Sequence, residues 1–322
     1  MNVSSSTPPV PALIQVDGLR VRYGDRWALD ELSFQVQAGE LVGLLGPNGA
    51  GKTTTLAVLA TLIRPDAGRA YVAGHDTVRE SARVRGVLGL VPQTLAIYPT
   101  LTARENLLFF ARLFRLRDVR GVAQRSLQLV GLEERADDIV ATFSGGMQRR
   151  LNLACGLLHE PRVVLLDEPT VGVDPQSRER IFDAVRGQAA RGAAILYSTH
   201  HMEEAERLCD RVVLIDGGCV VAAGTPAELI EREGGGLRLE LRTHSPLHAG
   251  WLDEVGGATI LERPPGAFDD GEVTHVSLDD LTLAARVLDC AASRGAGVVD
   301  FHLHRPSLQD VFLKFTGRAL RD

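Results

Sequence analysis

Residues 46–54 have the sequence GPNGAGKTT, which fits the glycine-rich pattern G-x-x-x-x-G-K-[ST]. Glycines in such a loop let backbone N–H groups converge on phosphate oxygens, and the lysine and threonine can reach the terminal phosphates and a Mg²⁺ ion. Lysine occurs only at positions 52 and 314, so a chance match is rare. An ordinary glycine-rich turn is the alternative. The residues expected to contact a nucleotide here are Gly46, Pro47, Asn48, Gly49, Ala50, Gly51, Lys52, Thr53 and Thr54.

Two adjacent acids end the apolar stretch VVLLDEP at residues 163–169. An apolar run of this kind predicts a buried strand, so Asp167 and Glu168 should lie at the carboxyl edge of a sheet. There, the first acid can hold Mg²⁺ and the second can polarise the water that attacks a γ-phosphate. A solvated acidic strand end is the alternative, and the phosphate loop in the same chain makes it the weaker one.

The elements that must position these residues follow from the spacing of apolar residues. Residues 41–45 are continuously apolar and precede the phosphate loop, and residues 52–62 have helical spacing, which together predict a strand, loop and helix. Further buried strands are expected at 162–166, 194–198 and 211–215, separated by helices at 177–188 and 202–209. This alternation predicts an α/β fold with a parallel sheet.

The same patterns divide the chain into regions. Residues 1–11 are rich in serine, threonine and proline and predict a disordered lead. Residues 12–230 form the expected nucleotide-binding domain, with a helical subdomain over about 94–160. The triple glycine at 234–236 marks a boundary, and residues 237–322 predict a small α/β domain.

Composition and sequence pattern argue against several classes of protein. The net charge of −6 over 322 residues disfavours nucleic acid as the partner. Four widely spaced cysteines argue against a disulfide framework or a zinc cluster. The uncharged run 87–103 contains Pro92, Gln93 and Pro99, so no membrane span is expected. The first residues lack the features of a secretory signal, and we therefore expect a cytoplasmic protein.

The octapeptide FSGGMQRR at residues 143–150 resembles the LSGGQ signature of ABC ATPases. The order of motifs is also similar to that family: phosphate loop, Gln93, helical insertion, signature, DEP and His200. The resemblance implies a P-loop NTPase core with an antiparallel β subdomain and an α-helical subdomain. It also implies a head-to-tail dimer, in which ATP lies between the phosphate loop of one copy and residues of the other, namely Ser144, Gly145 and Gly146.

Further roles come from the same resemblance. Tyr23 is placed like the aromatic residue that stacks on adenine, and Gln93 like the glutamine that contacts Mg²⁺ or the attacking water. His200 matches the histidine that donates to the γ-phosphate, and Asp174 matches a segment at the dimer interface. The signature departs from the family at Phe143 and Met147, so contacts of the usual glutamine side chain are absent or altered.

The SGGM variant and the C-terminal stretch 306–322 resemble exporter ATPases of the daunorubicin-resistance type. This resemblance implies an ATPase that uses ATP and Mg²⁺, pairs with a second ATPase subunit, and works with a polytopic permease on the cytoplasmic face of the membrane. Both halves of the ATP site are intact in this chain, which favours a homodimer over a pair with a different ATPase subunit. Export of hydrophobic drugs, antibiotics or lipids is implied in the same way. Two alternatives stay open: an importer ATPase, and a soluble ABC ATPase that acts on the ribosome or DNA. His302 and His304 predict a polar strand face rather than a metal site.

Overall fold

The computed structural model describes residues 12–245, 247, 250–261 and 273–317. They form two compact units: one reaches to Pro226, and the other begins at Ala227. The expected lead, residues 1–11, lies outside the described residues. In the described ranges, no helix is both long and apolar enough to cross a membrane.

A six-stranded sheet forms the centre of the first unit, with the strand order β10-β9-β3-β8-β7-β6. All pairs are parallel except β9 with β10. Every residue of β3, β7 and β8 is buried, as the continuously apolar runs predict. The bounds are β3 (Leu41–Leu45), β6 (Leu88–Val91), β7 (Val163–Asp167), β8 (Ala194–Thr199), β9 (Arg211–Asp216) and β10 (Cys219–Gly224).

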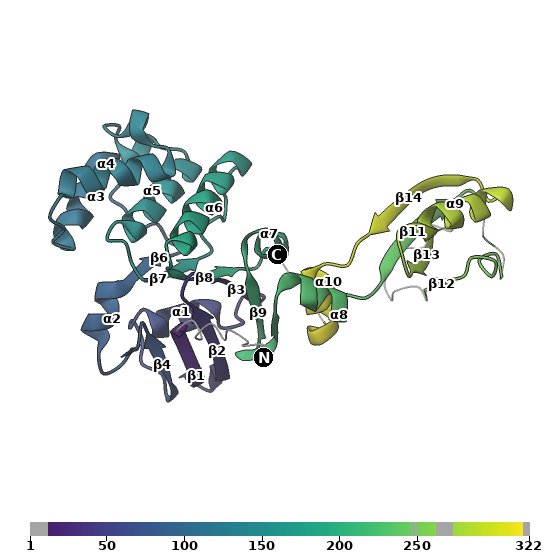
Figure 1. The fold of residues 1–322 in the computed structure, drawn as a ribbon, viewed down its shortest axis with the longest axis horizontal. Helices are drawn as coiled ribbons and strands as arrows, with labels where there is room; N and C mark the ends of the chain where they lie inside the picture. Colours follow the sequence, from purple (N-terminus) through teal and green to yellow (C-terminus); the bar gives the residue numbers. More distant parts are fainter. Residues whose placement is uncertain (1–11, 246, 248–249, 262–272, 318–322) are drawn as a thin grey trace, which may run out of the picture. The chain divides into compact units, whose positions relative to one another are not determined.

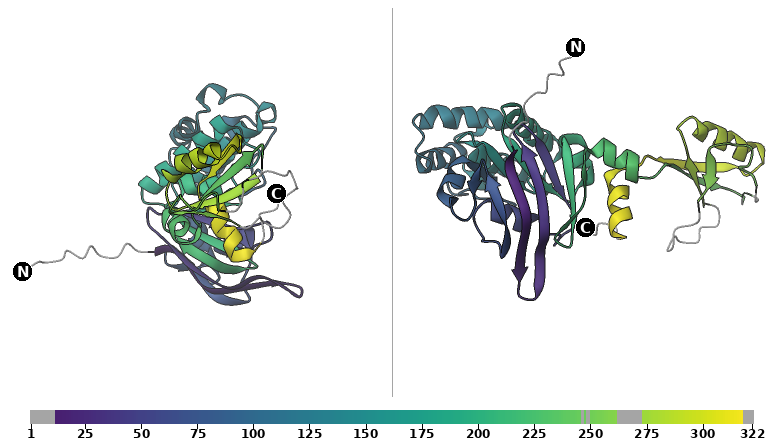
Figure 2. Two further views of the ribbon diagram at one scale, coloured as in Figure 1. Left: turned by 90° about the vertical axis from the view of Figure 1, so that its right-hand side faces the viewer. Right: turned by 60° about the horizontal axis from the view of Figure 1, so that its bottom comes forward.

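A second, antiparallel sheet packs against this centre, with the order β2-β1-β4-β5. Its two long strands lie side by side in Figure 2. One apolar core joins the two sheets, since Leu19 and Leu32 cluster with Val42 and Leu196. The predicted antiparallel subdomain is confirmed. It contains β1 (Ala12–Tyr23), β2 (Arg26–Gln37), β4 (Ala67–Val72) and β5 (His75–Asp76), and the nearby helices are α1 (Lys52–Leu59) and α2 (Ser81–Val87).

Three helices form the predicted helical subdomain: α3 (Ala103–Leu113), α4 (Val119–Val130) and α5 (Gly145–Leu157). Figure 1 shows them grouped together, and Leu107, Leu127 and Leu151 are fully buried in a shared core. Helices α6 (Pro175–Ala190) and α7 (Met202–Leu208) complete the unit. The first predicted helix ends at Leu59 rather than at residue 62, because Thr61 adopts a positive φ of 62°.

The second unit begins at Ala227 rather than after the triple glycine at 234–236, and it contains both strands and helices. An antiparallel sheet, β12-β13-β11-β14, packs against α9 around Trp251, Leu283 and Val287. Ser307 caps the last helix, and Phe315, which shares the helical apolar spacing of Leu308, Val311 and Phe312, is 42% exposed. The bounds are α8 (Pro226–Glu233), β11 (Leu237–Thr243), β12 (Ala258–Ile260), β13 (Val273–Leu278), α9 (Leu283–Ser293), β14 (Val298–His304) and α10 (Leu308–Thr316).

Candidate functional site

The phosphate loop connects the end of β3 to the start of α1. Its glycines are required by close packing: a Cβ atom on Gly46 would lie 2.2 Å from the Ile215 carbonyl oxygen. Gly51 has a φ of 110°, and a Cβ atom there would lie 2.7 Å from the carbonyl oxygen of Ala28. The loop therefore holds its backbone close to neighbouring strands, and its N–H groups surround the start of a helix, where anions are favoured.

Lys52 is almost fully buried, with 5% of its surface exposed. Its ammonium group donates to the carbonyl oxygens of Gly46 and Pro47 at 2.7 and 3.1 Å and lies 3.6 Å from Glu168 Oε1. Burial lowers the pKa of Lys52, and the charges of Glu168 and Asp167 oppose that shift. A partly desolvated ammonium group beside a glycine-rich loop is a strong electrostatic partner for phosphate.

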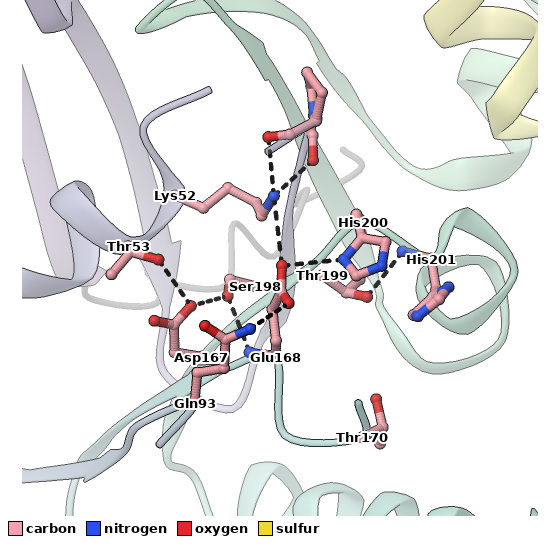
Figure 3. Close-up of polar contacts among 12 residues, drawn as sticks. Lys52, Thr53, Gln93, Asp167, Glu168, Thr170, Ser198, Thr199, His200 and His201 are labelled. Carbon is pink, nitrogen blue, oxygen red and sulfur yellow. Dashed lines mark hydrogen bonds and ion pairs between the residues drawn. The ribbon is translucent and has the colours of Figure 1, made fainter. Parts of the chain in front are cut away.

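Glu168 brings together the residues predicted to be catalytic (Figure 3). Its carboxylate accepts a hydrogen bond from Gln93 Nε2 at 3.0 Å and lies 3.1 Å from His200 Nδ1. The backbone of Glu168 has a φ of 46°, uncommon for a residue other than glycine, and its N–H donates to the carbonyl oxygen of Ser198 at 3.1 Å. This turn at the end of β7 places the carboxylate beside Lys52.

Asp167 is held by two hydroxyl groups. Ser198 Oγ donates to Asp167 Oδ1 at 2.6 Å, and Thr53 Oγ1 donates to the same oxygen at 3.4 Å. Ser198 Oγ also accepts the N–H of Glu168 at 3.2 Å, so one side chain orients both acids. Sequence reasoning did not identify Ser198. Its signal was its place two residues before His200, at the end of the strand expected at 194–198.

A cavity of about 390 Å³ opens in front of these groups, a size typical of small-molecule sites. Tyr23 lies at its edge and is 58% exposed, so a ring face is available for stacking. Arg26, which the sequence analysis did not select, also lines the cavity. The other lining residues are Ala28, Asn48, Gly49, Gly51, Lys52, Thr53, Thr54, Gln93 and Glu168.

The signature residues form a separate patch and do not line this cavity. Ser144 caps α5 and accepts the N–H of Met147 at 3.3 Å, while Asp174 caps α6 and accepts the N–H of Ser177 at 2.9 Å. That N–H group lowers the pKa of Asp174. A Cβ atom on Gly146 would lie 2.5 Å from Asp174 Oδ2, so the two helix starts are in contact.

A buried polar network around Glu204 lies next to the site, on residues close in sequence to Ser198 and Glu168. Glu204 is 4% exposed, and its Oε2 accepts from Thr170 Oγ1 and from the Tyr197 hydroxyl, both at 2.8 Å. Arg178 Nε lies 3.3 Å from Glu204 Oε1. Burial, reinforced by the charge of Glu204, raises the pKa of Tyr197 well above its usual value, so its hydroxyl stays a donor. No motif in the sequence signalled this network.

Comparisons with known proteins agree with this geometry. Residues 29–171 match the ABC transporter family. Three relatives align over nearly their full length. They are the linearmycin resistance ATP-binding protein LnrL of Bacillus subtilis (37% identical, covering 96% of this chain and 100% of that protein), the daunorubicin resistance ATP-binding protein DrrA3 of Streptomyces coeruleorubidus (42%, 94% and 96%) and the Nod factor export ATP-binding protein I of Burkholderia orbicola (42%, 97% and 99%).

Solved structures with this fold include an ATP-binding subunit of an ABC transporter, 33% identical, with a TM-score of 0.63 over 69% of this chain and 93% of that one. Another is the ATP-binding cassette MJ0796 in a dimeric post-hydrolysis state bound to ADP and Pi, 25% identical, with a TM-score of 0.60 over 66% of this chain and 98% of that one. The predicted fold class is confirmed. The chain belongs to the ABC transporter family and is one of its ATP-binding subunits, an ATPase of the exporter type.

Proposed function

We propose that two copies of this chain close around ATP and that their closure drives a separate membrane permease, at the cytoplasmic face, to export hydrophobic drugs, antibiotics or lipids. The observation that carries the proposal is the Glu168 carboxylate, which lies within 3.6 Å of groups from Lys52, Gln93 and His200. The relatives named for drug resistance and Nod factor export support an exporter over the importer, ribosome and DNA alternatives.

In this proposal the attacking water is polarised by Glu168 and positioned with help from Gln93. The ammonium group of Lys52 offsets the negative charge that develops on the β- and γ-phosphates. His200 donates to the γ-phosphate from the end of the site far from the phosphate loop. Tyr23 stacks on the adenine ring at the mouth of the cavity, and the backbone N–H groups of residues 46–54 bind the phosphates.

The oxygen atoms beside the phosphate loop suit Mg²⁺. Thr53 Oγ1 and Asp167 Oδ1 lie 3.4 Å apart, and Gln93 adds an amide at the same edge of the sheet. Hydroxyl, carboxylate and amide oxygens are the ligand types that Mg²⁺ takes, so we assign these three residues to it. When bound, the ion would offset part of the negative charge of the phosphates.

The signature patch supports the dimer. Ser144, Gly145 and Gly146 stand at the start of α5, where N–H groups and the helix dipole favour an anion, yet they lie outside the cavity of their own chain. We assign them to the ATP held by the other copy. Asp174, in contact with Gly146, is assigned to the same interface.

Replacing the central carboxylate tests the proposal. Glu168→Gln keeps the shape of the side chain but removes the base, so ATP hydrolysis should fall by roughly 10²- to 10⁴-fold. The variant should then sediment as a dimer with Mg-ATP and as a monomer without it. Glu203→Gln, an exposed change on α7, is the matched control and should behave like the wild type. A monomeric Glu168→Gln protein under both conditions would contradict the dimer.

An apolar groove offers a place for the permease. A cavity of about 270 Å³ is lined by Leu88, Leu90, Phe110 and Phe114 among others, and Ala96 lies at its wall. The N–H of Ala96 donates to Asn152 Oδ1 at 2.9 Å, and Arg149 donates to the carbonyl oxygen of Gln93. The segment that carries Gln93 is thus tied to the groove. We assign the groove to an apolar segment of the permease.

The groove can be tested at one helix end. Phe114 lines it and is 37% exposed, whereas the neighbouring Leu113 is 64% exposed and does not line it. Phe114→Asp places a charge in the apolar contact and should reduce co-purification of the permease from solubilised membranes at least tenfold, with the ATPase activity of the isolated chain unchanged. Leu113→Asp is the control. Equal recovery of the permease with both variants would contradict this assignment.

A further inference from the structure

A second large cavity lies at the edge of the parallel sheet opposite the phosphate loop. Its volume is about 490 Å³, and it is lined by α4, by the C-terminal ends of α5 and α6, and by the loops that precede β7 and β8. Val163 and Ala194, at the amino ends of these strands, are paired, whereas Asp167 stands at the carboxyl end of β7. The two cavities share no lining residue, so this one is separate from the nucleotide site.

Positive charge gathers in this cavity. Arg125, Arg162 and Arg191 line it, against the single carboxylate of Glu160. Arg125 pairs with Asp118 at 3.5 Å, and both of those side chains are exposed. Within the described part of the chain, Arg162 and Arg191 make no ion pair. The wall therefore carries an excess of guanidinium groups, whose planar donors match phosphate oxygens.

Two buried polar side chains also line the cavity. Gln188 is 4% exposed and Ser126 is 8% exposed. Across the described residues, neither the Gln188 amide nor the Ser126 hydroxyl has a hydrogen-bond partner in the protein. Neither side chain is among the polar groups closed off from solvent, so both can donate to or accept from a molecule in the cavity. A ligand with hydrogen-bonding oxygens would satisfy both side chains.

The rest of the wall is apolar and includes Val122, Leu129 and Leu157. A volume of this size, with apolar walls and a few convergent polar groups, is typical of sites for small organic molecules. We propose that this cavity binds a small organic phosphate: the arginines, Gln188 and Ser126 bind the phosphate group, and the aliphatic side chains contact an apolar body. The proposal does not depend on the dimer or the permease.

The probe for this site is 1-naphthyl phosphate, which carries a phosphate group on an aromatic body. Its fluorescence is titrated with the full chain in saturating ADP, which fills the nucleotide site. The double variant Arg162→Gln/Arg191→Gln should bind the probe at least tenfold more weakly, because it loses two charged donors. Arg64→Gln/Arg117→Gln changes two exposed arginines outside the cavity and is the matched control. 1-Naphthol, which lacks the phosphate, should also bind at least tenfold more weakly.

Hydrogen exchange of the wild-type chain gives a second measurement that needs no variant. The probe should slow amide exchange in residues 158–162 and 188–193, which border the cavity, and leave residues 46–54 unchanged. Equal affinity of the cavity variant and its control would overturn the proposal. So would displacement of the probe by ADP, equal binding of 1-naphthol, or protection confined to the phosphate loop.

Discussion

The two units differ in what they bury. The ATPase unit holds ionisable side chains in its interior, with Lys52, Asp167, Glu168 and Glu204 at 4 to 7% exposure. In the described part of the C-terminal unit the core is apolar, and Thr243 is the one buried polar residue. Burying a charge is costly unless it is paired, so such groups persist where they serve binding or chemistry.

This difference predicts which property a substitution in each unit will affect. A core substitution in the C-terminal unit removes apolar contacts and should lower the free energy of unfolding. A substitution among the buried polar groups of the ATPase unit should change kcat for ATP hydrolysis, because these groups hold the side chains of the site in place. Matched pairs of variants, one in each unit, can therefore test whether the two roles are separate.

The largest effect on stability is expected at Trp251, and the tryptophan of the other unit, Trp27, is its matched control. Trp251 is 1% exposed in the core of the C-terminal unit, and Trp27 is 40% exposed on β2. Trp251→Ala should cost about 3–5 kcal/mol of unfolding free energy in its own unit, measured by urea denaturation. ATP hydrolysis by the isolated chain should stay within about twofold of the wild type, since the residues proposed to be catalytic lie in the other unit.

Trp27→Ala is the control for this change and should cost far less, because the side chain is half exposed. Far-UV circular dichroism follows the unfolding of both units, and the remaining tryptophan in each variant reports by fluorescence on the unit that was not changed. Loss of ATPase activity in the folded Trp251→Ala protein would contradict the separation of roles and show that the C-terminal unit contributes to ATP hydrolysis.

The next effect is expected at Ser198, whose hydroxyl contacts both acids of the site. Ser198→Ala removes the 2.6 Å hydrogen bond to Asp167 and the one accepted from the Glu168 N–H. Losing a hydrogen bond to a charged group costs about 1.5–3 kcal/mol, which corresponds to roughly a 10- to 100-fold lower kcat if it is felt in the transition state. Steady-state ATPase measurements test this.

Ser293→Ala is the matched change in the other unit, where the hydroxyl donates to the Cys290 carbonyl oxygen at the surface. It should leave kcat unchanged. A Ser198→Ala protein with normal kcat would show that the two acids are positioned without this hydroxyl.

Motifs in the sequence predicted which residues form the site, but their contacts depend on the order of the strands in the sheet. Glu168 could be assigned from the apolar strand that it follows, since the carboxyl ends of parallel strands share one edge, whereas Gln93 and His200 were assigned from the resemblance to ABC ATPases. Ser198 needed the further fact that β8 lies between β3 and β7, which apolar periodicity does not encode. The contact between Ser198 and Asp167 exists only because those two strands are neighbours.

The same limit applies to sites without motifs. Arg125, Arg162 and Arg191 are separated by more than 25 residues each, and arginine is common throughout this chain. Nothing in their spacing indicates a shared cavity, which depends on where α4 and two loops meet. Likewise Phe315 fits a helical apolar pattern but is 42% exposed. The pattern predicts which face of the helix is apolar, but it does not predict which other element packs against that face.

The smallest effect is expected in the network beneath the site, at Tyr197. Tyr197→Phe removes the hydroxyl that donates to Glu204 at 2.8 Å, but the Thr170 hydroxyl still donates to the same carboxylate. The aromatic ring and its edge contact with Phe182 are retained. We expect a loss of about 1.5 kcal/mol in the free energy of unfolding, the lower end for a hydrogen bond to a charged group, with kcat unchanged.

Tyr98→Phe, at an exposed tyrosine, is the control and should leave the unfolding free energy unchanged. If Tyr197→Phe lowered kcat without changing stability, the network would position Glu168 rather than support the fold. A loss of stability alone would mean that the buried Glu204 supports the fold, and a loss of kcat alone would mean that it helps to position the site. Tyr197 can distinguish the two because it lies on β8 directly before Ser198 and hydrogen-bonds to neither Asp167 nor Glu168.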